Sequence, residues 1–117
     1  MIRSAGIDVG SSAIKVAIVE SSEGGGRARA DARVLASMVE RVRRRDQRDV
    51  VKLAYGQALE AAHLDAKQID YLATTGEGEL VEERTGHFYG MTAHARGAIF
   101  LVPGVRALLD VGALHAR

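Results

Sequence analysis

The chain has 117 residues, the size of one domain built around a single hydrophobic core. Its 16 Lys and Arg nearly balance its 15 Asp and Glu, so no overall field favours nucleic acid or a membrane surface. It has no cysteine, which excludes disulfides, thiolate metal ligands and a cysteine nucleophile within these residues. The longest strictly apolar run, 98–102, is too short to span a bilayer, and residues 1–4 do not resemble a signal peptide. We therefore expect a cytoplasmic protein with neither nucleic-acid nor membrane partners.

Residues 3–9 and 12–20 have the alternating, β-branched pattern of two strands joined by a short turn. In that turn Gly10 lacks a side chain, so backbone N–H groups can approach an anion closely. Ser11 and Ser12 add hydroxyl donors. The pattern indicates a phosphate-binding hairpin, and the alternative is an ordinary turn, in which Gly and Ser are common.

Two charged side chains flank this turn. Asp8 is suited to hold a hydrated divalent cation against phosphates. Lys15 lies in the second strand, where alternate residues face opposite ways, so it reaches either a phosphate or solvent.

The next part of the chain predicts a flexible polar turn at 20–26 and a third antiparallel strand within 28–39, where helix is the competing interpretation. Residues 47–63 have helical spacing of apolar positions, and Asp46 is placed to cap that helix. The basic run 41–48 has few aromatic neighbours, so we interpret it as a solvated or subunit-facing turn.

In the second half of the chain, glycine-rich segments separate apolar runs. The predicted elements are a strand at 69–74, a loop at 75–78, a short helix or extended turn at 79–83, an irregular segment at 86–90, a helix at 92–101 and a last strand at 105–111.

Two strand ends in this half carry candidate site residues. Thr75 and Gly76 follow the 69–74 strand, at the kind of strand end where α/β sheets bind nucleotides, although a simple turn is the alternative. Asp110 and Gly112 repeat the Asp-x-Gly pattern that begins at Asp8. A carboxylate that only caps a turn is the alternative for Asp110 taken alone, but the matching motif favours a paired site.

The order of three strands, helix, strand, helix and strand, with Asp-x-Gly motifs ending the first and last strands, resembles the ribonuclease-H-like lobe shared by actin, sugar kinases and heat-shock ATPases. This resemblance implies an α/β fold whose mixed sheet has a three-stranded antiparallel meander followed by β-α-β crossovers. Within that superfamily, four segments resemble the ATPase family of 2-hydroxyacyl-CoA dehydratase activators and benzoyl-CoA reductase subunits: 6–12 (GIDVGSS), 73–78 (ATTGEG), 94–98 (HARGA) and 103–106 (PGVR).

One departure from the activators sharpens the resemblance. Dehydratase activators usually have Asp-Ile-Gly-Gly-Gln-Asp at the second phosphate motif, whereas residues 110–115 read DVGALH. That ending and residues 87–92 (HFYGMT) resemble the D-type ATPase subunits of class I benzoyl-CoA reductases.

The resemblance implies a subunit that couples ATP hydrolysis to low-potential electron transfer. In the family the electrons would pass from a [4Fe-4S] cluster, held between two related ATPase subunits, to catalytic subunits that reduce benzoyl-CoA or a related acyl-CoA; the cysteine ligands of that cluster are absent from residues 1–117. ATP and Mg²⁺ are the implied cofactors. Asp8 and Asp110 would be catalytic and would hold magnesium through water; the implied nucleotide-binding residues are Gly10, Ser11, Ser12, Lys15, Thr75, Gly76 and Gly112.

The same resemblance implies that residues 1–117 are a single N-terminal lobe. The family's cluster-binding cysteines and adenosine-binding lobe lie further downstream, so we expect a fragment that is inactive alone. A non-catalytic remnant or interaction module is the main alternative function, and a lobe of an acetate or sugar-type kinase, which shares the first motif, is another.

Overall fold

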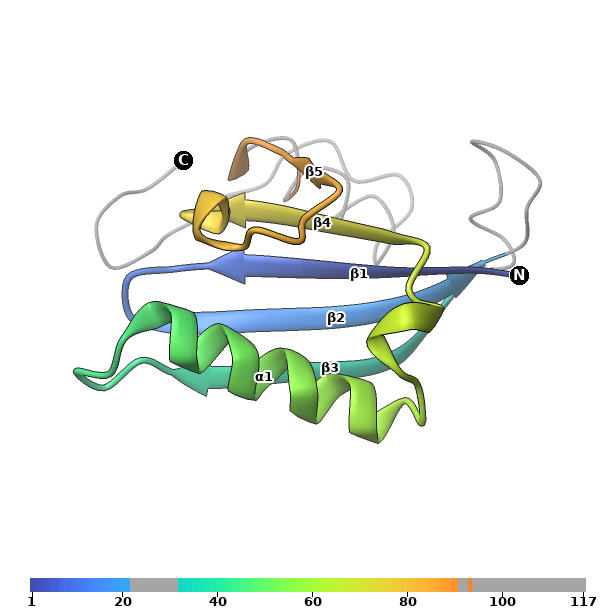
Figure 1. The fold of residues 1–117 in the computed structure, drawn as a ribbon, viewed down its shortest axis with the longest axis horizontal. Coiled ribbons are helices and arrows are strands. Elements are labelled where there is room, and N and C mark those ends of the chain that lie inside the picture. Colours follow the sequence, from blue (N-terminus) through green and yellow to red (C-terminus); the bar gives the residue numbers. More distant parts are fainter. Residues whose placement is uncertain (22–31, 91–92, 94–117) are drawn as a thin grey trace, which may run out of the picture.

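The computed structural model describes residues 1–21, 32–90 and 93, which form a five-stranded sheet with a helix against one face (Figure 1). The strands lie in the order β3-β2-β1-β4-β5, with β1, β2 and β3 antiparallel and with β4 and β5 parallel to β1. This confirms the expected mixed sheet and its antiparallel meander. The elements are β1 (Ile2–Val9), β2 (Ala13–Ser21), β3 (Arg33–Arg41), α1 (Gln47–Ala61), η2 (Ala66–Gln68), β4 (Tyr71–Gly76), η3 (Gly78–Leu80) and β5 (Gly86–His87), where η marks a 3-10 helix.

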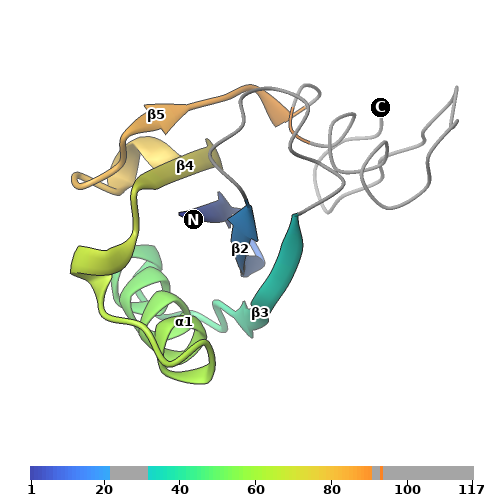
Figure 2. The ribbon, with the colours of Figure 1, turned by 90° about the vertical axis from the view of Figure 1, so that its right-hand side faces the viewer.

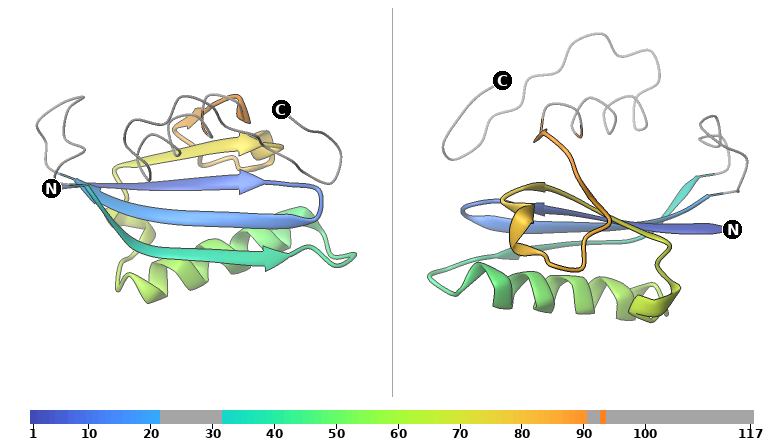
Figure 3. Two further views of the ribbon diagram at one scale, coloured as in Figure 1. Left: turned by 180° about the vertical axis from the view of Figure 1, so that it is seen from behind. Right: turned by 45° about the horizontal axis from the view of Figure 1, so that its top comes forward.

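The hydrophobic core lies between α1 and the sheet. Figures 2 and 3 show that α1 covers one face of the sheet. Strand residues alternate between faces, so every second side chain of β1 and β2 points at the helix. The buried apolar residues of β1 and β2 are Ala5, Ile7, Val9, Ile14, Val16 and Ile18, and the buried residues of α1 are Val50, Val51, Ala54, Tyr55 and Ala58. Within the described ranges, no helix is both long and apolar enough to cross a membrane.

Helix α1 begins where the sequence predicts and ends two residues earlier than the predicted 63. The Asp46 carboxylate accepts a hydrogen bond from the Arg48 backbone N–H at 2.8 Å, which confirms the expected cap. After the C-cap residue Ala62, His63 adopts a left-handed φ of 58°, which a helix does not continue.

Some predicted strand boundaries were wrong. The strand predicted at 69–74 is Tyr71–Gly76, because β1 offers parallel partners for β4 as far as Val9. The 86–90 segment, predicted to be irregular, contains β5, which pairs with β4. Strand β3 continues to Arg41, past the predicted limit at 39. The predicted helix at 92–101 and strand at 105–111 lie outside the described residues, apart from Ala93.

One buried charge cluster was not foreseen. Glu20, expected at the start of a polar turn, lies within β2 and is buried. Its carboxylate pairs with Arg3 on β1 at 3.3 Å and with Arg33 on β3 at 3.1 Å. This cross-strand cluster joins the three antiparallel strands.

The turn between β1 and β2 is tight and is held from outside. The Gly10 N–H donates to the Ala13 carbonyl at 3.0 Å, and a Cβ on Gly10 would lie 2.7 Å from the same oxygen. The Ser12 carbonyl accepts from the Val42 N–H at 2.9 Å, and the Gly10 carbonyl accepts from the Gln47 side chain at 2.8 Å. The segment that connects β3 to α1 therefore supports the turn.

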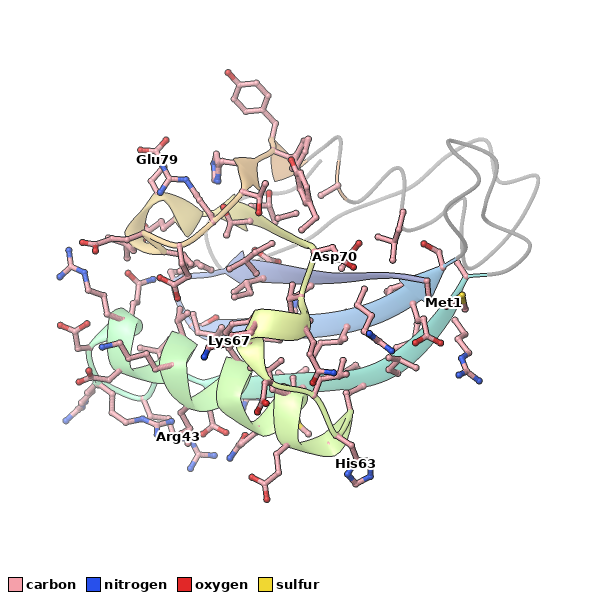
Figure 4. The ribbon with its side chains drawn as sticks, turned by 45° about the vertical axis from the view of Figure 1, so that its right-hand side comes forward. Met1, Arg43, His63, Lys67, Asp70 and Glu79 are labelled. Carbon is pink, nitrogen blue, oxygen red and sulfur yellow. The ribbon has the colours of Figure 1, made fainter. Side chains whose placement is uncertain are left out.

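The basic run forms a second turn beside the first. The Arg45 N–H donates to the Val42 carbonyl at 3.0 Å, while Arg43 and Arg44 have φ values of 48° and 66°. Positive φ at both central residues is the signature of a type I′ turn, which usually carries Asn-Gly. Arg45 closes the turn with an ion pair to Glu40 at 2.9 Å. Figure 4 shows Arg43 at the end of the sheet opposite Met1.

We predict opposite effects for two glycine substitutions. Gly10→Ala would push a methyl group into the Ala13 carbonyl and lower the free energy of unfolding by about 1–3 kcal/mol. Gly56→Ala lies inside α1, where the new Cβ would have no atom within 4 Å apart from its chain neighbours and the helix's own backbone, and it would raise the free energy of unfolding by roughly 0.5–1 kcal/mol. Urea denaturation followed by circular dichroism measures both. If both substitutions changed the free energy of unfolding equally, the result would contradict the geometry of the Gly10 turn.

A second prediction concerns the arginine turn. The double variant Arg43→Asn/Arg44→Gly suits a type I′ turn better and would raise the free energy of unfolding by about 1 kcal/mol. The charge-retaining control Arg43→Lys/Arg44→Lys would leave it unchanged. Thermal melts of the three proteins test this, and a lower melting temperature for the Asn-Gly variant would count against the turn type.

Candidate functional site

The candidate site lies where β1 and β4 end side by side, because the two strands are parallel (Figure 1). Asp8 is the cross-strand partner of Thr75 on β4 and of Lys15 on β2. Since side chains at paired positions share a face, these three residues form a row across the sheet. Asp8's neighbours Ile7 and Val9 are buried against α1, so the row lies on the opposite face.

The end of β4 lies directly against Asp8. Gly76 has a φ of 67°, and a Cβ there would lie 2.5 Å from the Val9 carbonyl oxygen and 3.0 Å from Asp8 Oδ1. The Glu77 N–H donates to the same Val9 carbonyl at 2.9 Å. Only glycine fits both this backbone conformation and this space. The predicted candidates Asp8 and Gly76 are thus in contact range.

The Thr75 hydroxyl is buried without a hydrogen-bond partner. Thr75 is 7% exposed, and its Oγ1 is the buried side-chain polar atom that lacks a partner among the residues that the structure describes. Buried hydroxyls are nearly always hydrogen-bonded, since an unpaired one costs about 1–3 kcal/mol. An unpartnered hydroxyl beside a carboxylate is able to donate to a bound ligand.

The neighbouring threonine, Thr74, faces the other way. It is 2% exposed, and its Oγ1 is hydrogen-bonded to His87 Nδ1 of β5 at 2.9 Å. Of these two threonines, only Thr75 shares the face of Asp8.

The remaining predicted residues fall into two groups. Ser11 and Ser12 are exposed at the tip of the first turn, and Lys15 is exposed on the face of Asp8. Asp110 and Gly112 lie outside the described residues, so their pairing with Asp8 stays a prediction. Within residues 1–21, 32–90 and 93, no three His, Asp or Glu side chains gather as a metal site.

The sequence did not predict two residues that pack against or bond to the segments carrying the candidate site, Gln47 and Gly78. Gln47 was assigned only to the helix, yet its side chain bonds to the Gly10 carbonyl. Gly78 was assigned to a loop, yet a Cβ there would lie 2.3 Å from Thr74 Cβ. The second glycine of the 75–78 segment was a signal of such close packing, whereas nothing in the sequence singled out Gln47.

A family model described as the BadF/BadG/BcrA/BcrD ATPase family matches residues 5–117. The chain is 47% identical over 119 residues to the D subunit of benzoyl-CoA reductase from Thauera aromatica, and the match covers 100% of this chain and 39% of that protein. The chain thus spans about two-fifths of the length of this curated relative.

Solved structures agree in fold. Component A of (R)-2-hydroxyglutaryl-CoA dehydratase from Acidaminococcus fermentans matches with a TM-score of 0.80 and 25% identity, over 95% of this chain and 39% of that one. The activator of 2-hydroxyisocaproyl-CoA dehydratase from Clostridium difficile, solved with bound ADPNP, matches with a TM-score of 0.79 and 21% identity, over 98% and 39%. These likenesses confirm the expected ribonuclease-H-like fold class. Together with the family match and the identity over the whole chain, they establish that the chain belongs to the BadF/BadG/BcrA/BcrD ATPase family.

Proposed function

We propose that this chain forms the phosphate-binding half of an ATPase subunit that couples ATP hydrolysis to low-potential electron transfer into benzoyl-CoA or a related acyl-CoA. The observation that carries the proposal is the unpartnered, buried Thr75 hydroxyl in register with Asp8. This hydroxyl supports a role in binding an oxygen-rich ligand. The 47% identity to the D subunit of a benzoyl-CoA reductase supports the choice of reaction.

The residues around Asp8 suit magnesium and phosphate. Carboxylate and hydroxyl oxygens are the hard donors that Mg²⁺ and its bound waters prefer. Asp8 would hold the ion through water, and the bound ion would neutralise charge on the phosphates. Thr75 Oγ1 would donate to a phosphate oxygen, and Gly76 would leave room for the phosphate chain.

The two serines and the lysine have separate roles in this proposal. Ser11, Ser12 and the backbone at Gly10 would bind the β- and γ-phosphates at the exposed tip of the turn. Lys15, exposed on the face of Asp8, would add positive charge. Asp110 would hold a metal-bound water or position the attacking water.

The residues of this chain do not fit the [4Fe-4S] cluster from which the proposed electron path starts. Cysteine thiolates hold [4Fe-4S] clusters, and this sequence contains none. The electron path would therefore begin outside residues 1–117. The proposed partners are a related ATPase subunit and the catalytic reductase subunits, in line with the multi-subunit naming of the relative.

Replacing the central carboxylate tests the proposal. Asp8→Asn keeps the shape but removes the charge that would orient the hydrated metal, so the rate of ATP hydrolysis by the full-length protein with its partner subunits would fall about 100-fold or more. Phosphate release with magnesium present is the measurement. Glu82→Gln, an exposed carboxylate after η3, is the matched control and would keep the wild-type rate.

Two outcomes would count against the proposal. Wild-type hydrolysis by Asp8→Asn would remove Asp8 from the reaction. A phosphorylated small molecule in place of free phosphate would favour the kinase alternative.

A further inference from the structure

The end of β4 is anchored on the face that does not bear the candidate site. There, Thr74 Oγ1 is hydrogen-bonded to His87 Nδ1 at 2.9 Å, and the Thr74 carbonyl accepts from the Phe88 N–H at 2.8 Å. Gly78 of η3 packs so closely that a Cβ would lie 2.3 Å from Thr74 Cβ. Side chain, backbone and neighbouring turn thus all restrain Thr74.

Restraint of Thr74 is transmitted to the next two residues. Consecutive strand residues point to opposite faces with little freedom in between, so the position of Thr74 sets that of the Thr75 hydroxyl. One residue further on, Gly76 lies against Val9 and Asp8 Oδ1. A shift of Thr74 would therefore move Thr75 Oγ1 relative to the Asp8 carboxylate.

The β4–β5 pairing alone is a weak restraint. Strand β5 has only two residues, and its register with β4 consists of Gly86 opposite Ala73 and His87 opposite Thr74. The Thr74–His87 bond links side chains of the two strands at the register position next to Thr75. It therefore adds a side-chain link to a pairing that is only two residues long.

We propose that Thr74 and His87 are positioning residues, which through the backbone of β4 hold the Thr75 hydroxyl where it donates to a phosphate oxygen of bound ATP. The inference rests on the proposed function. Neither residue touches the nucleotide; both act through Thr75.

Substitutions at the bond separate positioning from plain stabilisation. Thr74→Val keeps the shape but loses the bond, and His87→Phe keeps a ring without Nδ1. Each would lower kcat for ATP hydrolysis about tenfold or more, since small misplacements of binding groups are costly. Thr74→Ser restores the hydroxyl and His87→Asn replaces Nδ1 with an amide, so both would recover most of the rate.

A matched control exists at the other end of the same strand. The Thr85 hydroxyl accepts from the Leu72 N–H at 2.9 Å, so Thr85→Val also removes a hydrogen bond to β4, but away from the site. It would lower the melting temperature as Thr74→Val does and would leave kcat at the wild-type value.

A double-mutant cycle shows whether the effect passes through Thr75. In a Thr75→Val background, Thr74→Val would still lower the melting temperature but would cause no further loss of kcat. The inference would be overturned if the Thr74→Val and Thr75→Val factors of loss in kcat multiplied in the double variant. It would also be overturned if Thr74→Val and Thr85→Val lowered kcat equally. A wild-type rate in Thr74→Val would overturn it alone, whereas the absence of ATP hydrolysis in the wild-type protein would overturn the proposed function and this inference together.

Discussion

The parallel pairing of β1 with β4 is the constraint on which the candidate site depends. It runs from Ser4 opposite Tyr71 to Val9 opposite Gly76, and so brings two segments more than sixty residues apart to a common end. The first strand supplies a carboxylate and the second supplies a hydroxyl and a glycine. Neither segment is a site alone. The Val9 carbonyl, which accepts from the Glu77 N–H, closes the pair and fixes how far β4 extends.

The two faces of the sheet differ in chemistry. The face toward α1 carries the apolar residues of β1 and β2, and on β4 it carries Leu72 and Thr74, whose hydroxyl is hydrogen-bonded to His87. The opposite face carries Lys15, Asp8 and Thr75 in one row. Because strand side chains alternate, a single register sets both faces, and a slip of one residue would bury Asp8 against the helix.

Local patterns in the sequence were enough to predict the antiparallel meander, helix α1 and the short turn between β1 and β2. β-branched alternation marked β1 and β2, and helical spacing with Asp46 marked α1. The boundaries of β4 and the existence of β5 could not be predicted in this way, because they depend on partners distant in the chain.

The environment of Glu20 also depends on distant partners. In the sequence it looks like a turn residue, but in the fold Arg3 and Arg33 neutralise it across neighbouring strands. The motif made Asp8 a candidate from the sequence alone, whereas the hydrogen bonds of Gln47 and His87 could be seen only in the structure.

Hydrogen bonds from Gln47 to the Gly10 carbonyl and from Val42 to the Ser12 carbonyl join the serine turn to the start of α1. The turn is therefore a fixed part of the helix layer rather than a free tip of the hairpin. A ligand that displaces Gly10 must either break the bond to Gln47 or carry the first residue of α1 with it. A change in the position of the turn would therefore be passed to the first turn of α1 through Gln47.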